Sequence, residues 1–166
     1  MQKVDLNFVL NTNLFIGENK KLEISSILKE LNLNEPLLIL DKFFFKNMIN
    51  LKFLTNSGLL KSNNVYHYEL NFEPSYQYID SLKKKILQSK VKFDCILAIG
   101  GGSVMDTAKA LAYVLELRDS SINYRGFFST ANHKVFPVVC IPTTIGTASE
   151  VVYKASLINE IDNVKL

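Results

Sequence analysis

The chain has 166 residues, of which 48% are hydrophobic and 21% charged, so it is expected to form a packed core and not a disordered chain. This length suits one domain, or one half of a two-domain enzyme. The formal net charge is +3, but the basic residues are scattered apart from Lys83 to Lys85 in an expected helix, which favours a solvated helix face over a nucleic-acid-binding surface.

Helical and extended patterns alternate from the start of the chain. Apolar residues at helical spacing predict a helix over 20–32, and an uninterrupted apolar run at 37–41 predicts a buried strand that ends on Asp41. A second helix is expected over 43–56. The alternating segment at 65–70 predicts a half-buried strand.

The second half of the chain continues this alternation. A helix is expected after Pro74, and a second buried strand covers 94–99. Three glycines separate that strand from a helix over 103–117, and a fourth strand is expected at 136–141. The segment 151–158 alternates again and predicts another strand before a hairpin-like turn. This order predicts an α/β fold, with a Rossmann-like parallel sheet and helices on both faces.

The cysteines and the absence of signal-peptide and membrane-helix patterns favour an intracellular protein. Cys95 and Cys140 each lie inside an apolar run, which is typical of buried free thiols in a reducing environment. The opening MQKVDLNFVLNTN has no apolar stretch long enough for a signal peptide. No segment approaches the roughly 18 apolar residues of a membrane helix. We therefore expect a cytoplasmic protein with neither a membrane nor a nucleic acid as partner.

The stretch AIGGGSVMDTAK, residues 98–109, carries the strongest chemical signal. Backbone N–H groups of a glycine turn at a helix N-terminus can cradle a phosphate. We expect Ser103 to be the N-cap of the helix and Asp106 to complete a capping box. The stretch is neither a P-loop nor the G-x-G-x-x-G fingerprint. Spacing favours a phosphate-bearing ligand of open identity, against a tight turn with no ligand.

Two long motifs carry a family resemblance: DCILAIGGGSVMDTAKALA at 94–112 and IPTTIGTASEV at 141–151. They resemble the iron-containing (group III) alcohol dehydrogenases, and the resemblance covers essentially the whole chain. It implies that residues 1–166 form the NAD-binding N-terminal domain, with a dehydroquinate synthase-like topology. It also implies that the family's helical, metal-binding C-terminal domain is absent from these residues.

The resemblance further implies the residues that bind the cofactor. Gly101, Gly102 and Ser103 would hold the pyrophosphate of NAD, the threonines of the second motif would line the adenine and phosphate side, and Lys165 would reach the nicotinamide-side ribose. The implied set is Asp41, Gly101, Gly102, Ser103, Asp106, Thr143, Thr144, Thr147 and Lys165.

Asp41 bears on the choice between NAD and NADP. The resemblance places it at the adenosine ribose, where a carboxylate accepts hydrogen bonds from free hydroxyls and repels a 2′-phosphate. NAD is therefore favoured over NADP. The alternative role for Asp41 is an N-cap on the next helix. The chain departs from the family at Glu73-Pro74, where members have Asn-Pro and the asparagine contacts the cofactor.

By resemblance, the activity is hydride transfer between an alcohol and an aldehyde or ketone, with a small alcohol or carbonyl substrate and a homodimeric assembly. The family holds its metal with one Asp and three His, whereas His67 and His133 are the histidines present here. A structural or solvated role is favoured for both. Fe²⁺ or Zn²⁺ is therefore expected only in a longer parent protein. No catalytic residue or metal ligand is assigned within these residues.

This polypeptide alone is expected to bind cofactor without turnover, because nothing in it would polarise a substrate oxygen. Two alternatives stay open. One is a fragment of a glycerol-1-phosphate dehydrogenase or a dehydroquinate synthase-like enzyme, which the Gly-Thr-Ala-Ser-Glu stretch disfavours. The other is a non-catalytic nucleotide-binding module.

Overall fold

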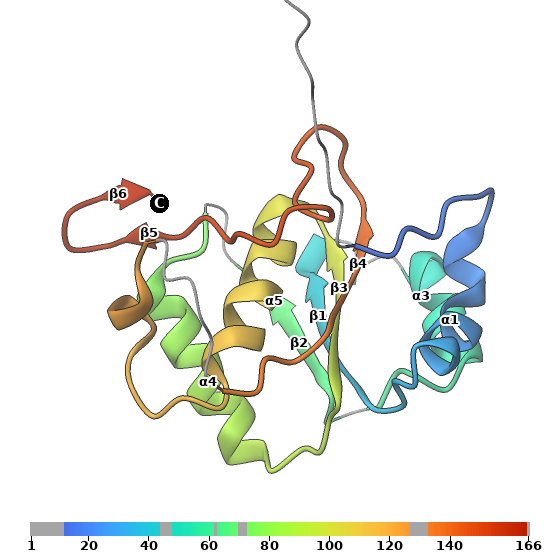
Figure 1. Ribbon diagram of the computed structural model, residues 1–166. Coiled ribbons are helices and arrows are strands. Elements are labelled where there is room, and N and C mark those ends of the chain that lie inside the picture. Colours follow the sequence, from blue (N-terminus) through green and yellow to red (C-terminus); the bar gives the residue numbers. More distant parts are fainter. Residues whose placement is uncertain (1–11, 44–47, 62, 70–72, 127–132, 166) are drawn as a thin grey trace, which may run out of the picture.

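A computed structural model describes residues 12–43, 48–61, 63–69, 73–126 and 133–165. Its centre is a parallel four-stranded sheet with the strand order β2-β1-β3-β4 (Figure 1). The strands are β1 (Pro36–Asp41), β2 (Val65–Tyr68), β3 (Cys95–Gly100) and β4 (Val138–Pro142).

The two central strands form the core of the sheet. Leu37 to Leu40 on β1 and Cys95 to Ile99 on β3 are completely inaccessible to solvent. Such uninterrupted apolar runs suit strands that are covered on both faces. The two buried strands expected at 37–41 and 94–99 are therefore confirmed.

Helices cover both faces of the sheet, as expected (Figure 1). On one face, the 3₁₀ turn η1 (Lys20–Glu23) leads into α1 (Ile24–Glu30), which packs with α3 (Met48–Asn56) against Leu38, Leu40 and Leu97. On the other face lie α4 (Tyr76–Ser89) and α5 (Gly102–Val114), followed by the 3₁₀ turn η2 (Ser121–Tyr124). Together, these elements form the three-layer α/β arrangement that the alternation predicts.

The strand expected over 151–158 is wrong. Only Ile158–Asn159 (β5) is extended, and it pairs antiparallel with Val164–Lys165 (β6) across the predicted turn. The residues before β5 are irregular because the Lys109 ammonium takes backbone carbonyl oxygens of this segment, Val152 among them. Backbone carbonyl groups that converge on one ammonium do not point in the alternating directions of a strand ladder.

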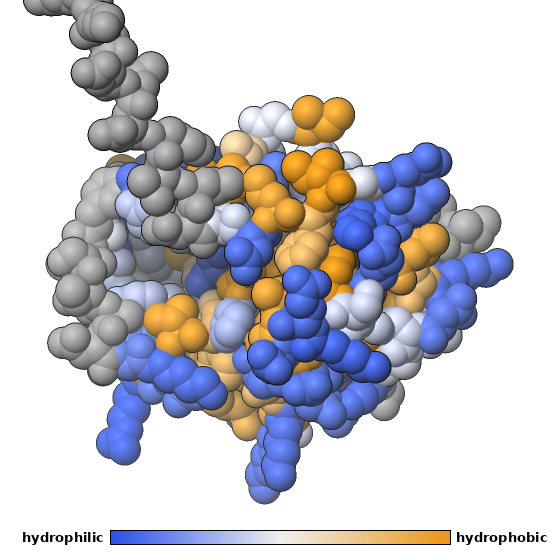
Figure 2. All heavy atoms as spheres, turned by 45° about the vertical axis from the view of Figure 1, so that its right-hand side comes forward, coloured by the Kyte–Doolittle hydropathy of each residue, from blue (hydrophilic) through white to orange (hydrophobic). Residues whose placement is uncertain are grey.

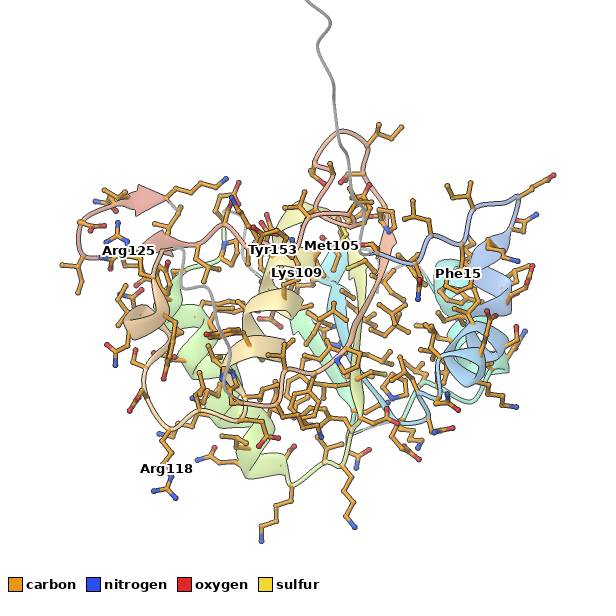
Figure 3. All side chains as sticks on the ribbon, in the orientation of Figure 1. Phe15, Met105, Lys109, Arg118, Arg125 and Tyr153 are labelled. Atoms are coloured by element: carbon orange, nitrogen blue, oxygen red, sulfur yellow. The ribbon has the colours of Figure 1, made fainter. Side chains whose placement is uncertain are left out.

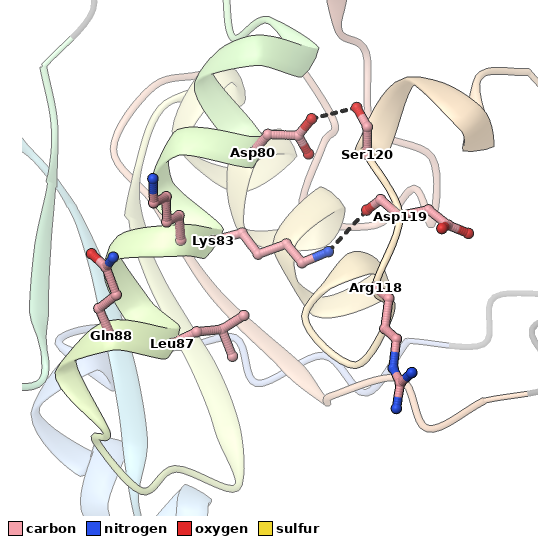
Figure 4. A pocket seen from close by; sticks show the side chains of 8 residues that line it. Asp80, Lys83, Leu87, Gln88, Arg118, Asp119 and Ser120 are labelled. Carbon is pink, nitrogen blue, oxygen red and sulfur yellow. Dashed lines mark hydrogen bonds between the residues drawn. The ribbon is translucent and has the colours of Figure 1, made fainter.

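The lysine run on α4 also differs from its expected role. Lys84 and Lys85 are exposed, but Lys83 is only 7% exposed. Its ammonium donates to the Asp119 carbonyl oxygen at 3.0 Å. It lines a hollow of about 430 Å³ between α4 and the α5–η2 connection, shown in Figure 4. The aliphatic stem of a lysine can cover apolar core while its ammonium reaches a polar partner.

Two further expectations can be compared with the described parts of the chain. Both cysteines are free thiols, as expected; Cys95 is buried as expected, whereas Cys140 is only half-buried. None of the helices that the structure describes has the length and apolar character to cross a membrane.

Candidate cofactor site

The glycine turn lies at the carboxyl end of β3, where α5 begins. Gly101 is the N-cap of α5, and no described side chain caps the helix there. The N–H groups of Gly102 and Ser103 occupy the first two helical positions, which have no acceptor within a helix. With the partial positive charge of the helix end, these donors suit an anionic group.

None of the three glycines has an unusual backbone conformation; Gly100 is required for space, and Gly101 and Gly102 allow a close approach. A Cβ on Gly100 would lie 2.5 Å from Val104 Cγ2, which no side chain tolerates. A Cβ on Gly101 would lie 3.1 Å from Thr144 Oγ1, and one on Gly102 would lie 3.0 Å from Thr147 Cγ2. Gly100 therefore lets α5 start close to the sheet, and the next two glycines let the second motif approach the helix N-terminus.

The second motif forms the threonine loop, residues 143–150, which rises above the sheet after β4 (Figure 1). The Thr143 N–H donates to the Gly100 carbonyl oxygen at 3.0 Å. Gly146 has a φ of +101°, which a glycine adopts at no steric cost. Thr143, Thr144 and Thr147 are all exposed. The structure thus brings the glycine turn and the predicted threonines together.

Ile145 lies in the same loop and is fully exposed. In Figure 2, hydrophobic side chains stand out at the upper edge of the molecule. The edge of the sheet that carries the glycine turn is therefore bordered by apolar as well as hydroxyl-bearing residues.

The capping box expected from Ser103 and Asp106 is wrong. The helix starts before Ser103, whose hydroxyl donates to Glu73 Oε2 at 3.5 Å. The Asp106 carboxylate instead accepts from the Ser149 hydroxyl at 2.6 Å and from the Ser156 N–H at 3.2 Å. Asp106 therefore fastens the end of the threonine loop and the segment after it to α5.

Lys109 completes this fastening and was not singled out from the sequence. Its Nζ lies 2.8 Å from Asp106 Oδ1 and donates to the carbonyl oxygens of Ser149 and Val152, each at 3.0 Å, and to that of Lys154. Figure 3 shows Lys109 on α5 beneath the segment that carries Tyr153. The signal available in the sequence was the spacing of Asp and Lys by one helical turn within the first motif.

Asp41 is at the same edge of the sheet as the glycine turn. The register pairs Leu40 with Ile99, so Asp41 ends β1 at the level of Gly100. Its Oδ1 accepts the Phe43 N–H at 2.7 Å. The capping role named as the alternative is thus present, and the half-buried carboxylate is placed beside the candidate site.

Lys165 approaches the site through Glu73. Lys165 Nζ is 3.0 Å from Glu73 Oε1, and the other oxygen of the same carboxylate accepts from Ser103. The residue at which the chain departs from the family pattern therefore contacts two of the predicted cofactor-binding residues.

The described residues do not fit a metal centre. They contain no group of three or more His, Cys, Asp or Glu side chains that could hold a metal ion. His133 Nε2 lies 2.8 Å from the Tyr113 carbonyl oxygen, and its ring packs edge-on against the Tyr113 ring at 4.7 Å. His133 thus has a structural role, and His67 lies within β2.

Comparison with known protein families decides the identity of the fold and motifs. The model of the iron-containing alcohol dehydrogenases matches residues 11–166. The chain belongs to this family. The resemblance drawn from the two motifs is therefore confirmed.

Individual relatives share these features over part of their length. The chain is 33% identical, over 84% of its length, to a mitochondrial hydroxyacid-oxoacid transhydrogenase of Caenorhabditis elegans. It is 26% identical, over 96% of its length, to an NAD-dependent methanol dehydrogenase of Bacillus methanolicus. It spans 30% and 41% of these two proteins, respectively.

A solved structure supports the fold directly. Sulfoacetaldehyde reductase from Bifidobacterium kashiwanohense, determined in complex with NAD⁺, superposes with a TM-score of 0.79 at 25% identity. The match covers 98% of this chain and 42% of the reductase. The Rossmann-like fold expected from the alternation is therefore confirmed.

Proposed function

We propose that residues 1–166 are the NAD-binding part of a metal-dependent alcohol dehydrogenase. The activity of the whole protein would be the interconversion of an alcohol and an aldehyde or ketone by hydride transfer. The observation that carries the proposal is the meeting of the uncapped α5 N-terminus with the threonine loop at the carboxyl edge of a parallel sheet. Ligands of open α/β sheets bind at this edge.

Different residues would bind different parts of the cofactor. The N–H groups of Gly102 and Ser103 would donate to the pyrophosphate, with Gly101 keeping the approach open. In the threonine loop, the hydroxyls of Thr143, Thr144 and Thr147 would donate to the neighbouring phosphate oxygens. Lys165 would reach the second ribose. When bound, the nicotinamide ring supplies the hydride acceptor or donor.

Asp41 and Asp106 would act in different ways. Asp41 lies one strand away from the glycine turn, and its carboxylate would accept hydrogen bonds from the adenosine ribose hydroxyls. Asp106 already accepts from Ser149 and Ser156. We therefore assign Asp106 to the site as a positioning residue that holds the threonine loop next to the helix.

The reaction itself needs more than these residues supply. Because the described residues hold no metal-ligand set, we assign them cofactor binding and no step of the chemistry. The substrate class we propose is a small alcohol or carbonyl compound. The names of relatives support this class, since one is a methanol dehydrogenase and another a sulfoacetaldehyde reductase.

Calorimetric titration of the purified chain with NAD and NADP tests the proposal. We expect NAD to bind and NADP to bind more weakly. In Asp41→Asn, the amide oxygen can still cap Phe43, while the charge that repels a 2′-phosphate is lost, so the preference for NAD should shrink about tenfold. If a chain shown to be folded by circular dichroism binds neither dinucleotide, the proposal is wrong. An unchanged preference in Asp41→Asn would remove only the role of Asp41.

A further inference from the structure

Glu73 connects two elements that the proposed function places at the cofactor. It stands just before Pro74 and helix α4, between the end of the sheet and the β5–β6 hairpin. One carboxylate oxygen lies 3.0 Å from Lys165 Nζ, and the other lies 3.5 Å from Ser103 Oγ. The Glu73 and Lys165 side chains keep 39% and 48% of their surface exposed, so both can exchange partners with a ligand.

The charges around Ser103 explain why this carboxylate matters. Lys165 contributes a positive charge from β6, Glu73 contributes a negative charge before α4, and Asp41 contributes another negative charge at the end of β1. Tyr68, at the end of β2, has a pKa raised to about 12: burial is the largest cause, a hydrogen bond with Ser103 opposes it, and nearby charges, among them those of Glu73 and Asp41, add smaller increases. Tyr68 is therefore neutral at physiological pH and adds no charge beside Ser103. The charge of Lys165 is neutralised by Glu73, which lies near the N-terminus of α5.

We propose that Glu73 is a specificity-determining residue that holds Lys165 and Ser103 in the free protein and releases them when a dinucleotide binds. This inference rests on the proposed function, because it assumes that the pyrophosphate lies at Ser103. A carboxylate at this position repels any phosphate that approaches the α5 N-terminus. Once released, however, it accepts hydrogen bonds from ribose hydroxyls.

A difference between ligands follows from these two effects. A dinucleotide brings a second ribose, whose hydroxyls offset the repulsion by donating to Glu73. ADP brings a diphosphate to the same place, with a further negative charge on its terminal phosphate, but no second ribose, so nothing offsets the repulsion. Glu73 therefore selects the complete dinucleotide against its anionic fragments.

The test compares the affinities of ADP and NAD in the wild-type chain and in Glu73→Gln. The amide keeps the size of the side chain and removes its charge. We expect Glu73→Gln to bind ADP about tenfold more tightly, which is the scale of one unit charge near a protein surface. NAD affinity should change by less than about threefold, so that the preference for NAD over ADP falls.

A second variant separates release of Lys165 from simple loss of repulsion. In the wild-type chain Lys165 is held by Glu73 and not by ADP, so Lys165→Met removes no direct contact and leaves only the exposed, solvent-screened charge of Glu73. This should weaken ADP binding by less than about threefold. In Glu73→Gln the ammonium is released, and Lys165→Met should then cost about tenfold. Equal effects of Lys165→Met in the two backgrounds would overturn the inference.

The surface pair Lys61–Glu35, with Nζ and Oε2 2.5 Å apart, provides the matched control. Glu35→Gln removes one carboxylate from an exposed ion pair away from Ser103 and should change neither affinity. If the wild-type chain binds NAD and Glu73→Gln binds ADP no more tightly, Glu73 is not a specificity determinant and the proposed function stands. If neither NAD nor ADP binds to any folded variant, the proposed function fails and this inference fails with it.

Discussion

Asp106 and Lys109 lie one helical turn apart on α5 and form an ion pair of 2.8 Å in which both side chains are almost entirely buried. The end of the threonine loop and the segment that follows it cover this pair. Ser149 gives Asp106 a hydroxyl hydrogen bond and gives Lys109 a carbonyl acceptor. The pair thus links the helix whose N-terminus forms the candidate site to the loop that faces it.

Replacing Lys109 by methionine should therefore reduce both stability and cofactor binding. Methionine keeps most of the length of the side chain but leaves the buried Asp106 carboxylate without its ion pair. The carbonyl groups that accept hydrogen bonds from the ammonium also lose their donor. We expect a loss of about 3 kcal/mol in the free energy of unfolding. Urea unfolding measures the first effect, and calorimetry with NAD measures the second at a temperature where the variant is folded.

The matched control is Lys85→Met on α4, where the lysine is exposed. It should leave both quantities within about 0.5 kcal/mol of the wild-type values. If Lys109→Met unfolds at the same urea concentration as Lys85→Met, the ion pair does not hold the loop.

Alanine substitutions in the glycine turn should separate a packing role from a binding role. In Gly100→Ala the new methyl group would collide with Val104, which is buried, so we expect a destabilisation of about 2 kcal/mol. In Gly101→Ala the methyl group would meet the exposed Thr144 at 3.1 Å. That threonine can move, so stability should change little while NAD affinity falls.

Gly17→Ala is the control for these variants, since its nearest neighbour, Lys20 Cδ, lies 3.8 Å away. Thermal unfolding and NAD titration of the three variants give the comparison. A Gly101→Ala chain that binds NAD as tightly as Gly17→Ala would show that the pyrophosphate does not approach this backbone.

The sheet was largely predictable from the sequence because its central strands leave a direct signal. A strand covered on both faces must be apolar throughout, and the runs at 37–41 and 94–99 each match an observed strand to within one residue at either end. The position of the glycine turn followed from the strand that precedes it. The pairing of the turn with the threonine loop needed the second motif, whose place in space is set by β4 beside β3.

Other features could not be read from local patterns. Ser103 has the chemistry of an N-cap, yet α5 begins earlier, with Gly101 as its N-cap. Alternation at 151–158 suggests a strand, but the Lys109 ammonium reaches this segment from more than forty positions earlier in the chain. Lys83 looks like a surface lysine, although it is buried against the Asp119 carbonyl group. Each difference comes from a tertiary contact, which sequence periodicity does not report.

Asp94 makes the free energy of unfolding depend on pH in the acidic range. Burial raises the pKa of this carboxyl, but the N–H groups of Asn34 and Glu35, at 2.7 and 3.0 Å, lower it more, and the net result is a pKa below the usual value. A group whose pKa is lowered by folding stabilises the protein above its unfolded pKa, which is about 3.9 for Asp. This contribution is lost as the pH falls through the folded pKa.

Asp94→Ala should therefore lose about 1 to 2 kcal/mol at neutral pH, because both N–H groups at the start of β1 lose their acceptor. The difference from wild type should stay constant from about pH 8 down to pH 5 and shrink below pH 4. Urea unfolding across this range measures it, with the exposed Glu116→Ala as control. If the difference in unfolding free energy between wild type and Asp94→Ala grows on acidification, folding does not lower the pKa of Asp94.

Cys140 should react slowly with thiol reagents although it is not fully buried. Burial, followed by smaller effects of neighbouring charges, raises its pKa to about 11, and the Lys109 ammonium opposes this only in part. At pH 8 about one thiol in a thousand is then ionised, against about a quarter for an unperturbed cysteine, so alkylation should be about two hundredfold slower than in the urea-unfolded chain.

Peptide mapping after timed iodoacetamide treatment resolves Cys140 from Cys95, which is completely buried and should be slower still. Because the Lys109 charge lowers the pKa of Cys140, Lys109→Met should make the thiol less reactive if the threonine loop keeps its place. A more reactive Cys140 in that variant would instead show that the loop has moved away and opened β4 to solvent. Either result reports on the ion pair with Asp106 without any cofactor, so it can be read even if the chain binds no dinucleotide.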